Sequence, residues 1–272
     1  MIKFYDIADE PLLTPTPSIV SFADLPPDSL YSSFRTFGGD KFLYLEEHLA
    51  RTRRSVVRLG WPPLDEPLLR RALAAVCIEG MDDVRVRYDF WENQRLTLAL
   101  IPFTPPPAAF YRDGVQVKVA DGVHRHNPLD KTAVFAQART AYLESHADEN
   151  GYEYLLADGG AIVEGFTSNF YGVRDGVLYT AGDGVLEGVT RRIILELLPA
   201  LNIPLVLEAV KMTALPFLDE AAMSSSSRGL LPIVGINGQP ISDGTPGPIT
   251  RALMQAYDEF VARTIRSGFF IS

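Results

Sequence analysis

Cysteine is almost absent from this chain of 272 residues, in which Cys77 is the single example. One cysteine excludes an intrachain disulfide, and so low a count fits a reducing compartment. Cys77 lies in the apolar run Leu73–Ile78, which predicts a core helix. We therefore interpret its thiol as a small buried hydrophobic group rather than as a nucleophile.

Long hydrophobic runs are also absent. No apolar stretch approaches the ~20 residues that a bilayer-spanning helix requires. The segment Met1–Asp6 shows no signal-peptide pattern. These observations predict a cytoplasmic protein that does not bind membranes.

An excess of positive charge is a third absence. The formal net charge is -9 and the isoelectric point is about 5.0, which argues against general nucleic-acid binding because that needs a basic surface. No glycine-rich dinucleotide turn follows a strand pattern, so hydride transfer is not indicated. The sequence also predicts no metal site.

The hydrophobic content of 47% allows a large core in one big domain or two modest ones. The strongest interruption is Pro102–Pro107, because its three consecutive prolines cannot lie inside a helix or a central strand. We predict a small α+β domain over residues 1–104, a stiff linker over residues 105–114, and a larger domain over residues 115–272.

Local patterns predict elements in both parts. The strictly alternating run Val84–Phe90 indicates a strand with one polar face. Glycine-containing turns at Asp158–Gly160 and Arg174–Gly176 indicate hairpins. Other segments predict helices, at Glu46–Leu59, about 133–150, Thr190–Leu201 and 248–265, and a strand at Val115–Val119.

The segment Ala161–Phe170 is the most informative part of the chain. Glu164 stands there between apolar residues, and an unpaired buried carboxylate is costly, so it needs a partner. A protonated heterocyclic nitrogen would be such a partner. Together with Lys131, 33 positions earlier, and later hydroxyl clusters, this segment suggests a pyridoxal-phosphate site. Such a site needs an amine, a carboxylate at the ring nitrogen and donors for the phosphate.

An ordered set of motifs carries a family resemblance over residues 34 to about 250. The motifs are Leu45–Arg51, Asp130–Thr132, Val163–Phe170, Leu186–Arg191 and Ser224–Pro232. The chain resembles the class IV, fold-type IV, pyridoxal-phosphate-dependent aminotransferases, which include branched-chain and D-amino acid aminotransferases and aminodeoxychorismate lyase. The resemblance implies an α/β (α+β) fold of two domains, in which a mixed, barrel-like β-sheet forms the core of the larger, cofactor-binding domain.

The resemblance also implies roles for single residues. Lys131 is implied to form the Schiff base and then shuttle a proton, Glu164 to bind the pyridine nitrogen, and Arg51 to reach the phosphate. We expect His48 to be structural, and Thr190 could also serve simply as a helix N-cap. The full set of implied cofactor-binding residues is Arg51, Lys131, Glu164, Thr167, Ser168, Gly188, Val189, Thr190, Ser226 and Ser227.

Three departures bear on the substrate. The segment Phe34–His48 is about two residues shorter than the family hairpin. Ala136 stands where many L-branched-chain members have a tyrosine, and the arginine and histidine two apart of D-specific members are not found. An α-carboxylate suits an arginine, and the candidates are Arg35, Arg85, Arg87 and Arg125.

The leading hypothesis is a ping-pong aminotransferase that moves an amino group between an amino acid and a 2-oxo acid, with a branched-chain or D-amino acid as the donor. An aminodeoxychorismate lyase that eliminates pyruvate and a non-catalytic binding protein on the same fold are the alternatives. The resemblance further implies a homodimer.

Overall fold

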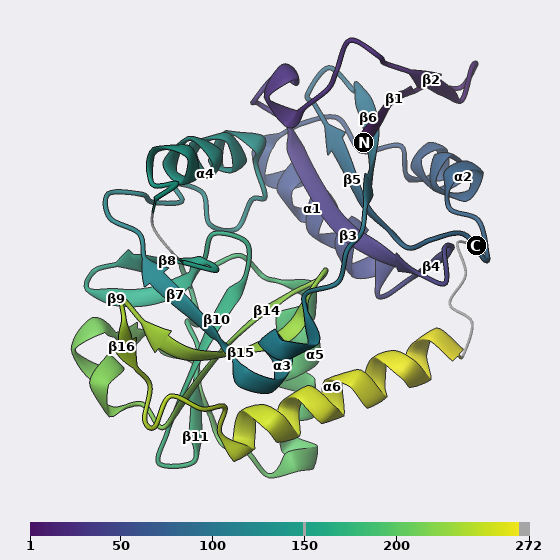
Figure 1. Ribbon diagram of the computed structural model, residues 1–272. Coiled ribbons are helices and arrows are strands. Elements are labelled where there is room, and N and C mark those ends of the chain that lie inside the picture. Colours follow the sequence, from purple (N-terminus) through teal and green to yellow (C-terminus); the bar gives the residue numbers. More distant parts are fainter. Residues whose placement is uncertain (149–150, 267–272) are drawn as a thin grey trace. The chain divides into compact units, whose positions relative to one another are not determined.

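The structure is a computed structural model that describes residues 1–148 and 151–266 (Figure 1). Its contacts divide the chain into two compact units. Unit 1 holds residues 1–104, 130–138 and the described part of 261–272, and unit 2 holds residues 105–129 and 139–260. Residues 130–138 therefore group with the first unit, although they follow residue 115 in the chain. The predicted division into domains stays a prediction.

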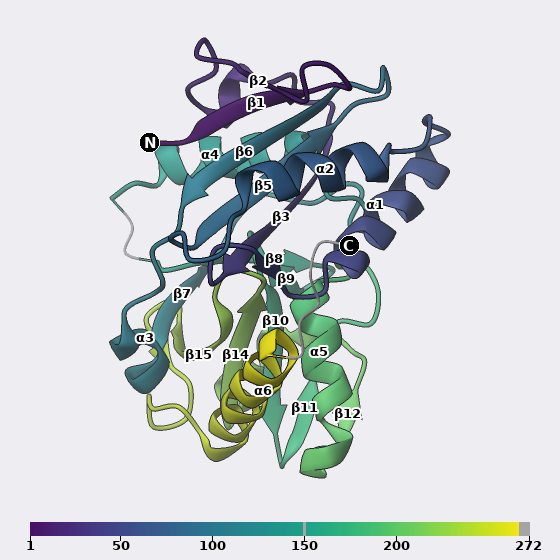
Figure 2. The ribbon, with the colours of Figure 1, turned by 90° about the vertical axis from the view of Figure 1, so that its right-hand side faces the viewer.

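Unit 1 is built on a six-stranded sheet with the order β2-β1-β6-β5-β3-β4. Two helices, α1 and α2, pack on one face of this sheet (Figure 2). The alternating pattern predicted the strand Val84–Phe90 correctly, and it is β5. The other elements are β1 (Lys3–Ile7), β2 (Leu13–Pro15), β3 (Leu30–Phe37), β4 (Lys41–Phe42), β6 (Leu96–Pro102), α1 (Leu45–Leu59), α2 (Glu66–Val76) and the 3-10 helix η1 (Phe22–Asp24).

The core of unit 1 lies between the helices and the sheet. Leu49 of α1 and Leu73 of α2 are fully buried beside Val86 and Leu98 of the sheet. Cys77 is buried at the end of α2, as expected, and burial together with the charge of Asp40 raises the pKa of its thiol to about 12. A thiol in this state is almost entirely protonated at neutral pH, so it is a poor nucleophile.

Unit 2 contains a mixed sheet with the order β12-β11-β10-β14-β15-β7-β8-β9-β13. A further pairing, Asn169 with Glu164, joins β10 to β9 and closes six of these strands into a ring. The expected barrel-like core is thus confirmed. The strands are β7 (Val115–Val119), β8 (Tyr154–Asp158), β9 (Ala161–Gly165), β10 (Asn169–Arg174), β11 (Val177–Tyr179), β12 (Leu205–Val206), β13 (Val210–Lys211), β14 (Glu220–Ser225), β15 (Gly229–Ile236) and β16 (Gln239–Pro240).

The helices of the second half match their predicted starts better than their ends. The helix expected over Thr190–Leu201 is α5 (Val189–Leu197) followed by the 3-10 turn η2 (Pro199–Leu201), because a proline has no N–H to continue the α-helical ladder. The helix expected to reach residue 150 is α4 (Ala133–Ser145), and residue 150 lies outside the described residues. The others are α6 (Pro248–Arg266) and the 3-10 helix η3 (Met212–Phe217).

The predicted linker over residues 105–114 contains a short helix, α3 (Ala108–Asp113), which the sequence did not indicate. It begins directly after Pro107, so the prolines limit the chain only up to that point. Phe110 and Tyr111 of α3 pack against the core of unit 2. In the part of the chain that the structure describes, no helix combines the length and apolar character needed to cross a bilayer.

Candidate active site

The backbone around Lys131 is tied to the rest of unit 1. Asp130 accepts a hydrogen bond of 2.5 Å from Arg58 at the end of α1. The carbonyl of Lys131 accepts a hydrogen bond of 2.8 Å from the backbone N–H of Tyr31 in β3. The Lys131 ammonium lies 5.1 Å from the centroid of the Tyr31 ring. The amine therefore projects from a fixed backbone onto the face of an aromatic ring, an arrangement that suits a cation.

Arg51, the predicted phosphate ligand, is buried on α1. Its guanidinium donates a 2.9 Å hydrogen bond to the hydroxyl of Ser32, which lies 3.0 Å from Nδ1 of His48. Burial lowers the pKa of His48 well below its ordinary value of 6.5, and the positive charges of Arg51 and Lys131 lower it further. The imidazole is therefore neutral at physiological pH. Neutral His48 and Ser32 together orient Arg51, which gives His48 the structural role expected from the sequence.

The neutral state of His48 predicts a specific pH dependence of stability. Its pKa is lower in the folded chain than in the unfolded chain, so stability is fully present above about pH 6.5 and is lost as the pH falls toward the folded pKa. Urea unfolding at pH 7.5 and at pH 5.5 should show that the wild type loses about 1 kcal/mol more than His48→Asn. Equal losses in the two proteins would contradict a buried neutral imidazole.

The arginines proposed for the substrate carboxylate have different surroundings. Arg87 is buried and donates two hydrogen bonds, of 2.7 and 2.5 Å, to Asp89. Its guanidinium lies 3.9 Å from the ring centroid of Tyr31. Arg85 is exposed on the same strand, and Arg35 lies over the rings of two phenylalanines. The polar face predicted for β5 is thus exposed at Arg85 and buried at Arg87. Their substrate roles stay a prediction.

In unit 2, Glu164 is a buried residue of β9. One carboxylate oxygen accepts a 2.7 Å hydrogen bond from Nε of Arg125, and the other accepts a 3.2 Å bond from the backbone N–H of Leu186. The expectation that this carboxylate needs a partner is correct, and Arg125, proposed as a substrate ligand, is one partner. The two contacts hold the carboxylate in a fixed orientation.

The N-terminus of α5 follows two residues after Leu186. Gly188 is the N-cap residue, and among the described side chains none caps this helix, so the alternative role of Thr190 as an N-cap is wrong. Val189 and Thr190 are buried in the first turn. The side-chain amide of Asn169 donates a 2.9 Å hydrogen bond to the carbonyl of Leu186. A side chain at Gly188 would collide with the oxygen of that amide. The backbone N–H groups and the dipole of such a helix end favour an anion, so this donor set fits a phosphate.

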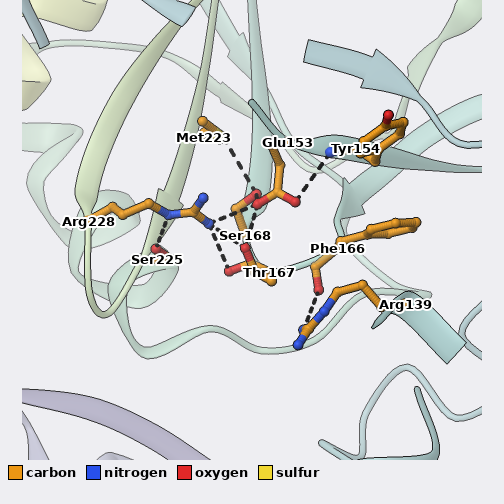
Figure 3. Close-up of polar contacts among 9 residues, drawn as sticks. All are labelled: Arg139, Glu153, Tyr154, Phe166, Thr167, Ser168, Met223, Ser225 and Arg228. Atoms are coloured by element: carbon orange, nitrogen blue, oxygen red, sulfur yellow. Dashed lines mark hydrogen bonds and ion pairs between the residues drawn. The ribbon is translucent and has the colours of Figure 1, made fainter. Parts of the chain in front are cut away.

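Two turns carry the remaining hydroxyls. The β9–β10 turn (residues 166–168) contains Thr167 and Ser168, and both of their hydroxyls hydrogen-bond to Glu153 (Figure 3). The β14–β15 turn (residues 226–228) contains Ser226 and Ser227, so the serine run forms a hairpin turn rather than a flexible linker. Whether these side chains bind a cofactor stays a prediction.

Sequence reasoning missed three residues of these surroundings. Ser32 gave no signal, because a serine in a strand resembles one on a surface. Glu153 precedes an apolar strand, and that position resembles the position that drew attention to Glu164. Arg228 lay inside a quoted motif but received no role. Lys131 belongs to unit 1 and Glu164 to unit 2, so their predicted meeting at one cofactor stays a prediction.

Comparisons with known proteins agree with the resemblance. A family model described as amino-transferase class IV matches residues 29–236. The D-alanine aminotransferase of Staphylococcus aureus (strain N315) is 27% identical over 251 residues, which cover 86% of this chain and 88% of that protein. The family model spans most of the chain, and the residues it matches include every motif quoted above.

Solved structures show the fold. A branched-chain amino acid aminotransferase from T.th., solved with pyridoxamine 5'-phosphate, has a TM-score of 0.79 at 20% identity, covering 95% of this chain and 93% of that one. A protein assigned as a 4-amino-4-deoxychorismate lyase has a TM-score of 0.72 at 29% identity, covering 89% and 96%. The predicted fold type IV is confirmed, and with the family match this chain belongs to the class IV aminotransferases.

Proposed function

We propose that the chain is a pyridoxal-phosphate-dependent aminotransferase that moves an amino group between an amino acid and a 2-oxo acid. The observation that carries the proposal is the segment from Leu186 to Thr190. Its first N–H binds the buried Glu164 carboxylate, and its end forms the N-terminus of α5, which no described side chain caps. The carboxylate proposed for a ring nitrogen is thus hydrogen-bonded to the short segment whose end carries the donors proposed for a phosphate.

When bound, pyridoxal phosphate supplies an electron sink for the electron pair released at the α-carbon of the substrate. Glu164 would hold a proton on the ring nitrogen. The N-terminus of α5, Arg51 and Ser226 and Ser227 would bind the phosphate. The amine of Lys131 would hold the cofactor and, once displaced, carry the proton that leaves the α-carbon.

The amino donor is proposed to be a branched-chain or a D-amino acid. The relative from Staphylococcus aureus is a D-alanine aminotransferase, and Ala136 departs from the L-branched-chain pattern. The proposal also includes a homodimer and a cytoplasmic location, as the family resemblance and the sequence suggest.

Half-reaction spectra test this function. The purified protein with pyridoxal phosphate should absorb near the visible edge, and an accepted amino donor should remove that absorbance. A panel of D-alanine, L-leucine, their mirror images and an R-amine identifies the donor. A protein that lacks this absorbance once unbound cofactor has been removed, or that responds to no donor, contradicts the proposal.

A second candidate has a specific observation in its favour: the protein assigned as a 4-amino-4-deoxychorismate lyase is 29% identical to this chain. That reaction would use the same lysine to eliminate pyruvate. Incubation with 4-amino-4-deoxychorismate and no 2-oxo acid separates the two candidates. Pyruvate release under these conditions supports the lyase, because a transaminase needs an acceptor to turn over.

A further inference from the structure

The two turns that carry the predicted cofactor hydroxyls lie at the same end of the barrel in unit 2. Strands β8 and β9 are antiparallel, with Leu155 opposite Gly165, so the start of β8 lies beside the end of β9. Strands β10 and β14 are also antiparallel, with Asn169 opposite Ser224. The start of β8, the β9–β10 turn and the β14–β15 turn are therefore neighbours.

Glu153, at the start of β8, connects to both turns. One of its carboxylate oxygens accepts hydrogen bonds from the Thr167 hydroxyl at 2.5 Å and from the Ser168 hydroxyl at 3.4 Å (Figure 3). The same oxygen accepts a 2.8 Å hydrogen bond from Arg228 of the β14–β15 turn. Its second oxygen lies 3.3 Å from the backbone N–H of Tyr154.

Arg228 makes the complementary set of contacts. Its Nη2 donates to Glu153, to the Thr167 hydroxyl at 2.5 Å and to the Thr167 carbonyl at 3.3 Å. Its Nε donates to the Ser225 hydroxyl at 2.9 Å, within its own hairpin. One guanidinium therefore binds the side chain and the backbone of one turn while it is anchored in the other. A lysine could not make all of these contacts together, because its single nitrogen cannot reach Ser225 and the Thr167 turn from two separate positions as Nε and Nη2 do.

The pair is largely shielded from water. The Glu153 side chain is 6% exposed and that of Arg228 15%. Burial alone would lower the pKa of Arg228, but the charge and hydrogen bond of Glu153 outweigh burial and raise that pKa. A shielded, charge-assisted pair of this kind fixes its partners more firmly than an exposed pair does. The structure thus holds the two turns in one relative geometry.

We propose that Glu153 and Arg228 are positioning residues for the cofactor: their ion pair locks the β9–β10 turn to the β14–β15 turn and so holds the Ser226 and Ser227 hydroxyl donors and the backbone of both turns in one arrangement. The inference rests on the proposed function, because it is the cofactor that these donors would bind. Neither residue needs to touch the cofactor itself. A misplacement of about 1 Å can lower a reaction rate by about 100-fold, and we expect a loss of up to that order in cofactor affinity when these donors are misplaced.

Cofactor titration of the apoprotein tests this. Arg228→Met should raise the dissociation constant of pyridoxal phosphate by about 10- to 100-fold, and excess cofactor should recover the activity that is lost at low cofactor. Arg228→Lys keeps the charge but not the fork of donors, so its dissociation constant should lie between those of the wild type and Arg228→Met. Glu153→Gln should also weaken binding, because it removes the charge and keeps the shape.

Arg112→Met is the matched control, since Arg112 forms an ion pair with Asp113 in which both side chains are exposed. It should leave the dissociation constant unchanged. Thermal unfolding of each apoprotein separates lost binding from lost folding, and Arg228→Lys and Glu153→Gln carry the test if Arg228→Met fails to fold. If the wild type binds pyridoxal phosphate and a folded Arg228 or Glu153 variant binds it equally tightly, this inference is wrong but the proposed function is not contradicted. A wild type that binds no pyridoxal phosphate contradicts the proposed function as well.

Discussion

Lys131→Ala is expected to abolish transamination, with activity lower by about 10⁴-fold or more, because the variant loses both the amine that holds the cofactor and the base that moves the α-proton. Absorbance near the visible edge should disappear with it. Borohydride reduction in the presence of pyridoxal phosphate should add a stable mass to the wild type, on the peptide that contains residue 131, and none to the variant. These measurements report covalent attachment and catalysis separately.

Two further variants show whether the amine or its charge matters. Lys131→Arg retains a cation beside Tyr31 and His48, so it preserves the local electrostatics, but a guanidinium does not replace the amine as a nucleophile. It should be as inactive as Lys131→Ala. Lys3→Ala removes an exposed lysine of the same unit and should retain full activity and trapping. Trapping that persists in Lys131→Arg would place the reactive amine elsewhere.

Patterns that depend on neighbouring residues could be predicted from the sequence. The residues of Val84–Phe90 and of Asp158–Gly160 are enough by themselves to indicate a strand and a turn, and both elements appear as expected. β3 received no prediction because Ser32 and Thr36 interrupt its apolar pattern. Both are buried in the structure, where Ser32 accepts from Arg51 and Thr36 accepts from a backbone N–H of β5. A buried serine or threonine whose partner is distant resembles a loop residue in sequence.

The candidate site likewise contains features that could be predicted from the sequence and features that could not. The burial of Glu164 followed from its apolar flanks, and the start of α5 directly after Gly188 followed from the helical pattern there. The pairing of Glu153 with Arg228 could not be predicted, because the two residues are 75 positions apart and either one alone resembles a surface charge. Such pairs are set by strand order, which periodicity does not reveal.

The pairing of Glu164 with Arg125 allows the structural and the chemical roles of this carboxylate to be separated. Glu164→Gln keeps the shape and the acceptor for the Leu186 N–H but removes the charge opposite a buried guanidinium. Breaking a buried ion pair on one side costs about 3 kcal/mol or more, whereas replacing both partners costs much less. Urea unfolding of the apoprotein should therefore show Glu164→Gln to be strongly destabilised, and Arg125→Met combined with Glu164→Gln to be more stable than that single variant.

Activity should not follow this recovery. If Glu164 holds a proton on the ring nitrogen, its negative charge stabilises the positive charge of that nitrogen. The loss of the Glu164 charge should therefore lower kcat by about 10²- to 10³-fold. The double variant lacks the same charge, so it should be as slow as Glu164→Gln even though its fold is restored. Wild-type kcat in the double variant would mean that the carboxylate serves Arg125 and not the cofactor. Arg125→Met alone completes the comparison, because Arg125 is also a candidate ligand for the substrate carboxylate. A double variant that is stable but much slower than Arg125→Met indicates a chemical role for Glu164 beyond the stability of unit 2.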